Sequence, residues 1–287
     1  MALKDTQRLR IIVIDKDVFQ GIQASHLCSF AKNHCLVLSQ HLLYECLTAT
    51  YDGRQHLMQR FEDTISAGAY IGPLVRGMLQ KEGNSLQPYG FLPDLAMTSE
   101  MRRAIHKNRI RYDRGVVAGL EQREKESGEF LLDLTRSAAS YVEQKNPRGA
   151  EVARKYQGSR LERLKVFLEF VDTVDMHEVA CQQMGHLTHS PEDFCLSPEW
   201  VSWQYLRLIT VLTFEYGMHS QKGTNMRPPR AHHDVLDVEY VVLLSRADGI
   251  LTRDKKLVTP LAQAAFPEKD VFFSLDEVPD EYLCHWS

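Results

Sequence analysis

The chain has 287 residues, of which 44% are hydrophobic and 25% are charged, and its formal net charge at pH 7 is -4. These values are typical of a globular protein with a sizeable core and argue against an extensively disordered chain. The net negative charge gives no overall attraction to nucleic acid, so any nucleic-acid site would have to be a local basic patch.

The cysteines and the apolar segments predict a soluble, cytoplasmic protein. The 6 cysteines include no Cys-x-x-Cys pair, and the apolar run at 11–14 is too short for a secretory signal. Free thiols in a reducing compartment are the simplest explanation. No apolar stretch approaches the roughly 20 residues needed to span a bilayer. We therefore expect no membrane association.

The N-terminal segment has the pattern of an α/β domain. Residues 11–14 (IIVI) predict a buried strand, and residues 18–32 predict a helix. A second apolar strand is expected at 35–38, followed by Ser39 as a plausible N-cap of the next helix. The succession strand, helix, strand, helix is typical of an α/β fold.

The middle of the chain differs, because residues 55–224 have a helical pattern interrupted by joints rich in Gly, Pro and Asn. The clearest helix follows Ser159, which forms a capping-box pattern with Glu162. Ser197 and Pro198 indicate another helix start, with the proline at the first helical position.

From about residue 225 the α/β pattern returns. The segments expected there are a helix, a strand, a helix and a strand, at 234–246, 249–252, 254–264 and 270–273. The predicted architecture is an α/β fold with a central parallel sheet. Residues 1–54 and 225–287 would form one discontinuous domain, and 55–224 would interrupt it as a mostly α-helical insertion.

Carboxylates follow two apolar strands near the extremities of the chain. Asp15 and Asp17 come directly after the first strand, and Asp254 follows the strand at 249–252. In an open α/β sheet, parallel strands bring such residues to one edge of the sheet. Each Asp could instead be an N-cap or a first-turn residue of the following helix, which is the commonest use of Asp after a strand.

Two predicted helices supply further carboxylates. Glu45 lies among apolar residues, where a carboxylate either marks the boundary of the core or points into a polar pocket. Asp234 and Asp237 are three residues apart in the first turn of the 234–246 helix, so they lie on nearby faces. One of them could be only a cap.

Order and context join these carboxylates into one hypothesis. Four elements would each bring one acidic residue to the same edge of the sheet, namely Asp15, Glu45, Asp237 and Asp254. Carboxylates about 4 Å apart repel by roughly 4 kcal/mol per pair at an effective dielectric constant of about 20. Mg²⁺ and Mn²⁺ prefer oxygen ligands of this kind. The sequence therefore predicts a metal-dependent phosphodiesterase site.

Four strings resemble the PIN-domain nucleases: VIDKDVF, HLLYECL, DVLDVEYVVLL and ADGILTRDKKL, at 13–19, 41–47, 234–244 and 247–257. The resemblance covers roughly the first 50 and the last 60 residues and does not reach the middle of the chain. It implies a PIN-like three-layer fold with a central parallel sheet. It also implies a Mg²⁺- or Mn²⁺-dependent nuclease, most often one that acts on RNA.

The resemblance also implies roles for single residues. The metal-binding and catalytic positions correspond to Asp15, Glu45, Asp237 and Asp254, and the supporting positions to Asp17, Asp234 and Thr252. The implied mechanism is hydrolysis of a phosphodiester bond by a metal-activated water, which needs no protein nucleophile.

Cations that could contact phosphate occur in the insertion and beside the acidic motifs. The candidates are Arg109, Arg111, Arg230, Arg253 and Lys255. Such contacts would be independent of sequence, but a solvated helix face explains the basic residues of the insertion equally well. The insertion could also form a homo-oligomer or bind another protein.

Two other functions remain open. IIVIDKDVF also resembles the opening motif of haloacid-dehalogenase phosphatases, with Asp15 as nucleophile, Asp17 as acid/base and Ser39 in the second motif. That reading leaves Glu45 unexplained, and no lysine motif is evident. Alternatively, a PIN-like fold could serve as a non-catalytic RNA-binding or assembly module. A scaffold would have no reason to retain four carboxylates.

Overall fold

The computed structural model describes residues 9–49, 51–107, 158–172, 197–220 and 228–284, with scattered helical residues between 118 and 151. Within this part of the chain, no helix is long and apolar enough to cross a membrane.

The centre of the protein is a sheet of five parallel strands in the order β3-β2-β1-β4-β5. The strands are β1 (Ile11–Ile14), β2 (Cys35–Ser39), β3 (Tyr70–Gly72), β4 (Gly249–Leu251) and β5 (Asp270–Phe272). Every residue of β1 and β2 is buried, as expected of strands covered on both faces. Ile14 pairs with Leu38 on one side and with Leu251 on the other, so these strands end level with one another.

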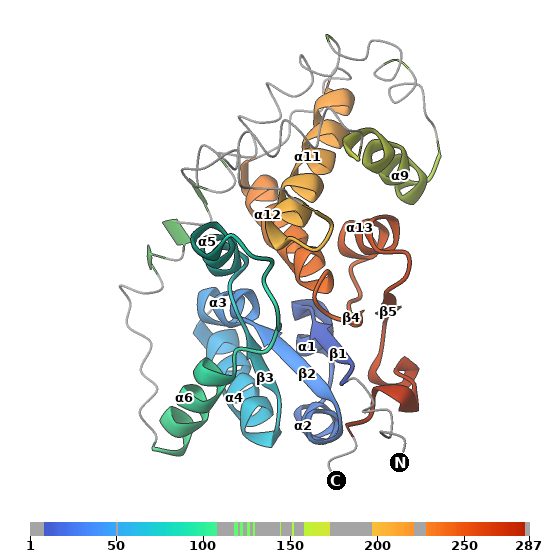
Figure 1. The fold of residues 1–287 in the computed structure, drawn as a ribbon. Coiled ribbons are helices and arrows are strands. Elements are labelled where there is room, and N and C mark those ends of the chain that lie inside the picture. The colour runs from blue at the N-terminus through green and yellow to red at the C-terminus, as the bar shows by residue number, and fades with distance from the viewer. Residues whose placement is uncertain are drawn as a thin grey trace, which may run out of the picture.

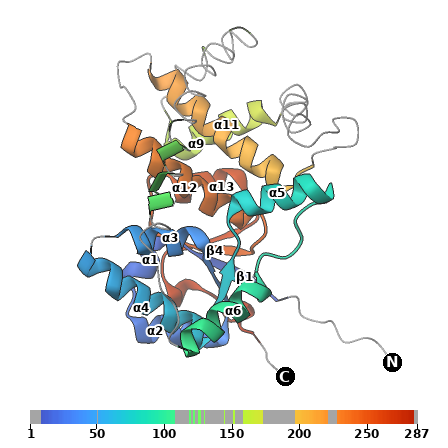
Figure 2. The ribbon, with the colours of Figure 1, turned by 90° about the vertical axis from the view of Figure 1, so that its left-hand side faces the viewer.

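Helices cover both faces of the sheet, which makes a three-layer α/β fold (Figures 1 and 2). The layer of α2 and α4 lies on one face, and the layer of α12 and α13 lies on the other, with α9 and α11 packed outside it. The helices are α1 (Lys16–Gly21), α2 (Ala24–Asn33), α3 (Gln40–Thr48), α4 (Tyr51–Ala67), α5 (Val75–Ser85), α6 (Leu95–His106), α9 (Arg160–Val171), α11 (Val201–Ser220), α12 (Pro228–Leu244) and α13 (Val258–Ala265). Two short 3₁₀ helices, Leu275–Glu277 and Asp280–Tyr282, follow β5.

The fold confirms the α/β class and corrects several element boundaries. β3 lies inside 55–224, the segment predicted to be a helical insertion, and pairs in parallel with β2. The sheet domain therefore extends beyond the boundary predicted at residue 54. The helix predicted at 18–32 is two helices, because Ile22 and Gln23 adopt extended backbone conformations between α1 and α2.

Two later helices begin at other residues than expected. α12 starts at Pro228, so Asp234 and Asp237 lie in its second and third turns rather than its first. α11 starts at Val201 and not at Pro198. The capping box of Ser159 and Glu162 is confirmed at the start of α9.

A buried carboxylate explains where α11 begins. Glu82, in α5, is 0% exposed, and its Oε1 accepts hydrogen bonds from the backbone N–H groups of Tyr89 and Val201, both at 2.8 Å. Its Oε2 accepts from the backbone N–H of Ser202 at 2.7 Å and from its hydroxyl at 2.5 Å. A charged acceptor at a helix N-terminus satisfies amides that have no partner within the helix.

Replacing Glu82 with Ala should destabilise the protein by on the order of 3 kcal/mol, because buried amides of Val201 and Ser202 lose their acceptor. Urea unfolding measured in parallel with Glu169→Gln, an exposed carboxylate of α9, provides the comparison. Equal unfolding midpoints for the two variants would contradict this role of Glu82.

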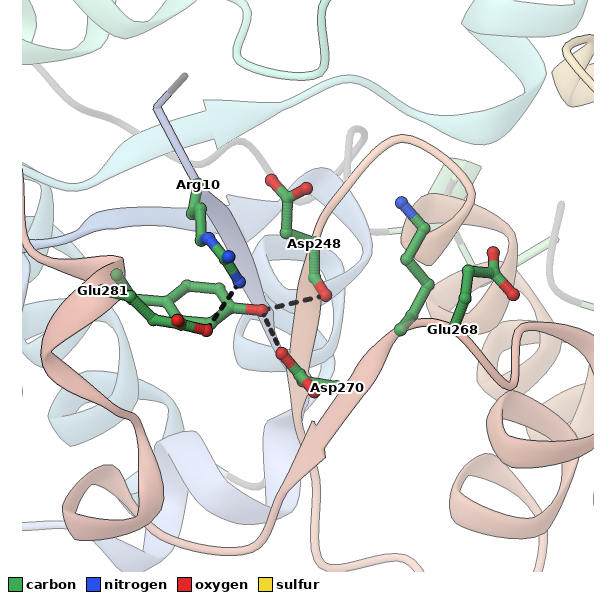
Figure 3. A pocket seen from close by; sticks show the side chains of 7 residues that line it. Arg10, Asp248, Glu268, Asp270 and Glu281 are labelled. Atoms are coloured by element: carbon green, nitrogen blue, oxygen red, sulfur yellow. Dashed lines mark hydrogen bonds and ion pairs between the residues drawn. The ribbon is translucent and has the colours of Figure 1, made fainter. Parts of the chain in front are cut away.

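The acidic residues at the amino edge of the sheet have structural partners (Figure 3). Oδ2 of Asp248 accepts a hydrogen bond of 2.8 Å from the backbone N–H of Ile11. The Tyr282 hydroxyl lies 3.0 Å from the Asp248 carbonyl oxygen and 2.7 Å from Asp270 Oδ2. Arg10, Asp248, Asp270 and Tyr282 line one cavity of about 520 Å³. These contacts fasten the C-terminal segment to the end of the sheet opposite the acidic motifs.

Candidate functional site

The acidic residues singled out by the sequence gather at the carboxyl edge, where β1 and β4 lie side by side. The chain leaves β1 toward β2 on one side, while β4 lies on the other, so this is the topological switch point of the sheet. Ligands of open α/β proteins bind in the crevice at such points. Oδ2 of Asp15, directly after β1, accepts a hydrogen bond of 2.6 Å from the hydroxyl of Thr252, directly after β4.

Asp15 is not primarily a helix cap. It occupies the N-cap position of α1, but its side chain makes no capping hydrogen bond. The residue is only 4% exposed. Burial raises the pKa of the Asp15 carboxyl to about 7; the Thr252 hydroxyl opposes this shift, and the charges of Glu45 and Asp17 add to it. Asp15 is therefore a carboxylate held within the site by a polar partner.

Glu45 joins three helices at the site. Ser39 is the N-cap of α3, because its side chain accepts a hydrogen bond of 3.0 Å from the Leu42 backbone N–H. α3 carries Glu45 toward α12. Oε2 of Glu45 accepts a hydrogen bond of 2.7 Å from the Tyr240 hydroxyl. Oε1 lies 3.2 Å from Nζ of Lys16, in α1. The Glu45 carboxylate thus accepts a hydrogen bond from a neutral hydroxyl and pairs with a cation.

The carboxyl group of Asp237 lies close enough to the other carboxylates for their charges to raise its pKa. Its carboxylate is partly buried and accepts no hydrogen bond from any residue in the described ranges. Burial raises the pKa of this carboxyl to about 8, and four further carboxylates add to the shift, those of Asp15, Asp254, Glu45 and Asp234. The predicted acidic residues are therefore brought into one electrostatic environment.

Asp254 has the structural role that was the alternative for it. Its Oδ1 accepts a hydrogen bond of 2.6 Å from the backbone N–H of Lys256, and its Oδ2 accepts one of 3.2 Å from that of Val258. The Leu257 amide lies 3.2 Å and 3.3 Å from the two oxygens. Asp254 thus caps the turn that leads into α13, while its charge still acts on Asp237.

The side chains are not arranged as a ligand cage. Among the described residues, no three His, Cys, Asp or Glu side chains are placed so that they could hold one metal ion. Glu45 is turned toward Lys16 and Tyr240, and Asp254 toward backbone amides. The predicted four-ligand set is therefore gathered in one region without a common coordination geometry.

The supporting residues have different positions. Thr252 is 0% exposed and links the two halves of the site, because its Oγ1 also accepts a hydrogen bond of 3.1 Å from the Asp254 amide. Oδ2 of Asp234 accepts a hydrogen bond of 2.5 Å from the Tyr216 hydroxyl, in α11. Asp17 is exposed.

Of the predicted phosphate-binding cations, two are described at the carboxyl edge. Arg253 and Lys255 are exposed on either side of Asp254. Nε of Arg253 donates to the Phe273 carbonyl at 3.2 Å, and Nζ of Lys255 lies 5.6 Å from the centre of the Phe273 ring. Arg109 and Arg111 lie outside the described residues, as does the side chain of Arg230.

Two further arginines of the segment predicted as an insertion, Arg102 and Arg160, are used within the fold. The guanidinium of Arg102 donates to three backbone carbonyls, those of Ile65, Gly68 and Ala69. Arg160 pairs with Glu215, its Nη2 lying 2.6 Å from Oε2. These two arginines therefore stabilise the fold instead of presenting charge to a polyanion.

Two residues at the site were missed by the sequence reasoning. Lys16 stands between Asp15 and Asp17, and nothing in that local sequence indicates that it pairs with Glu45. Tyr240 follows Asp237 by three residues, a spacing that places both on nearby faces of a helix. That spacing was the available signal, but the pairing with Glu45 depends on how α3 packs beside α12.

Ser39 has a structural role that argues against the phosphatase alternative. Its hydroxyl is fully buried and caps α3, so it is not placed to contact a substrate phosphate. The second motif of a haloacid-dehalogenase phosphatase would require that contact.

Comparisons with protein-family models, with curated proteins and with solved structures find no match to this chain. The functional argument therefore rests on the site.

The metal-free protein should become less stable as the pH rises from 6 to 8.5. A carboxyl whose pKa is raised to about 8 on folding binds a proton that the unfolded chain, with a pKa near 3.8, has released. Stability falls with pH wherever the folded state holds more protons. We expect Asp237→Asn to remove on the order of 1–2 kcal/mol of this decline.

Urea unfolding in EDTA at the two pH values measures the effect, with Glu100→Gln, an exposed carboxylate of α6, as the control. The same pH dependence of stability in Asp237→Asn and wild type would show that the pKa of Asp237 is not raised on folding.

Proposed function

We propose that this protein is a divalent-metal-dependent nuclease that hydrolyses phosphodiester bonds of RNA at the carboxyl edge of its sheet. The observation that carries the proposal is the gathering of carboxylates from four separate elements around the junction of β1 and β4. The Asp15–Thr252 hydrogen bond of 2.6 Å and the Glu45–Tyr240 hydrogen bond of 2.7 Å fix two of them there.

The chemistry of the donors suits Mg²⁺ or Mn²⁺. Both ions prefer carboxylate and water oxygens, and the residues gathered at this edge are carboxylates. The candidate ligands are Asp15, Glu45 and Asp237, which would have to turn toward one another to share an ion, because no three such side chains converge in the described structure. Asp254 would contribute mainly charge because backbone amides occupy its carboxylate. When bound, the ion would supply an activated water and neutralise charge on the phosphate.

The chain's own residues prepare the site in three ways. Thr252 donates to Asp15 and so fixes the orientation of that carboxylate. Tyr240 does the same for Glu45. Lys16 holds a positive charge beside Glu45, where it balances one of the carboxylates. The preference for RNA over DNA, and the PIN-like character of the fold, rest on the sequence resemblance.

Mn²⁺-dependent cleavage of labelled single-stranded RNA should be lost in Asp15→Asn and Asp237→Asn, by about 100-fold or more, because each variant removes an oxygen donor and a charge. Gel analysis of the products, with Mn²⁺ or with EDTA and against single-stranded DNA of the same sequence, measures this. Glu100→Gln is the control and should cleave as the wild type does.

Each rival has its own outcome in the same preparation. Hydrolysis of a small aryl phosphate by the wild type, lost in Asp15→Asn, would instead indicate the phosphatase. RNA binding that persists in EDTA, with no cleavage under any condition, would indicate the non-catalytic module.

Lys16→Met should increase the thermal stabilisation that Mn²⁺ gives to the protein. Without the Lys16 ammonium, the site carries one more uncompensated negative charge, so a bound cation relieves more repulsion. The melting temperature with and without Mn²⁺ is compared with that of Lys165→Met, an exposed lysine of α9. A smaller shift in Lys16→Met than in the control would mean that Lys16 is not the internal counter-ion of the site.

A further inference from the structure

A second cavity lies beside the acidic edge. It encloses about 580 Å³ and is lined by the end of α1, by one side of α2 and by the segment that follows β5. This volume lies within the range of about 300–1,000 Å³ that is usual for pockets binding small organic molecules. Its lining includes none of the carboxylates Asp15, Glu45 and Asp237.

Two chain segments connect the cavity directly to the site. α1 starts at Lys16, next to Asp15, and ends at Gly21, which lines the cavity. Six helical residues span only about 9 Å. On the other side, Arg253 follows Thr252 and also lines the cavity. The cavity therefore lies close enough to the acidic edge for one strand to reach both.

Arg253 is an exposed side chain with a hydrogen bond beside the cavity. Its Nε is fixed by the Phe273 carbonyl at 3.2 Å. Glycine at position 21 leaves room for the guanidinium, because a Cβ atom there would lie 2.6 Å from Nη1 of Arg253. Arginine presents planar donors that match the geometry of phosphate oxygens.

The rest of the lining suits a nucleoside. Gln23 and Ser29 offer an amide and a hydroxyl that can bind ribose hydroxyls or base edges. The Asn33 amide already donates to the Ser29 carbonyl at 3.2 Å, and Phe30 stacks on His34 in the same lining. Asp276 is the only carboxylate in the lining among the described residues, against the charge of Arg253. This balance differs from that of the neighbouring acidic site.

We propose that this cavity binds one nucleotide of a single-stranded RNA substrate, with Arg253 on its phosphate, so that the adjoining phosphodiester lies at the acidic edge. This assignment rests on the proposed nuclease function and adds the substrate's position to it. A concave pocket of this size admits a splayed nucleotide of a single strand, whereas duplex recognition uses broad groove contacts.

Binding of a fluorescent 12-nucleotide single-stranded RNA in EDTA, over a series of salt concentrations, tests the cavity. Arg253→Gln should weaken binding about fivefold or more and lower the slope of log K against log salt by about one. Arg253→Lys should restore the slope because it keeps the charge. Ser29→Trp, at an exposed position, should also weaken binding because the indole fills the cavity.

Lys32→Gln is the matched control, since it removes an exposed cation from α2 that does not line the cavity. Unchanged affinity in Arg253→Gln and Ser29→Trp, or affinity lost equally in Lys32→Gln, would overturn the proposal. Equal affinity for DNA of the same sequence would overturn the assignment to RNA.

Cleavage in Mn²⁺ separates this proposal from the proposed function. If both hold, Arg253→Gln and Ser29→Trp raise KM about fivefold while kcat stays within about twofold. Wild-type cleavage with no change of KM in either variant would contradict the assignment of the cavity but support the nuclease function. Binding that depends on the cavity, without cleavage by the wild type, would contradict the nuclease function but support the assignment of the cavity.

Discussion

The parallel pairing of β1 with β4 is the constraint on which the candidate site depends. It joins residues that are 237 positions apart in the chain, and the Asp15–Thr252 hydrogen bond closes the junction at its carboxyl end. Ile12, Val13 and Ile14 pair with consecutive residues of β4. Because these strands are fully buried, a slip in register would expose backbone groups and core side chains together. Formation of the core therefore also brings the acidic residues to this edge of the sheet.

The polar contacts around this junction divide the carboxylates by their partners. Asp15 accepts a hydrogen bond from the Thr252 hydroxyl, and Asp254 accepts hydrogen bonds from backbone amides. Glu45 accepts a hydrogen bond from the Tyr240 hydroxyl and pairs with the Lys16 ammonium. Asp237 has none of these in the described chain, and the charges around it raise its pKa. A fold that only needed packing would gain stability from a neutral residue at position 237. A pKa perturbed by burial and by neighbouring charges is typical of functional sites.

The sequence predicted those features that depend on local patterns and missed those that depend on distant contacts. The apolar runs of β1 and β2, the Ser39 cap and the Ser159 capping box were all predicted, because each signal lies within a few residues. The three-residue strand β3 has no comparable pattern. The start of α11 depends on Glu82, more than a hundred residues earlier, and so could not be read locally. Likewise, whether Asp254 binds a metal or caps a turn depends on geometry that its motif leaves open.

The segment predicted as an insertion is also part of the site's support. Arg160, in α9, pairs with Glu215 in α11 and donates to the backbone carbonyl of Lys256, in the turn that Asp254 caps. The residue after Glu215 is Tyr216, which donates to Asp234 on α12. Two helices from the middle of the chain thus hold both the Asp254 turn and the helix that carries Asp237. Their position, and not only that of the sheet, determines how closely the acidic residues approach one another.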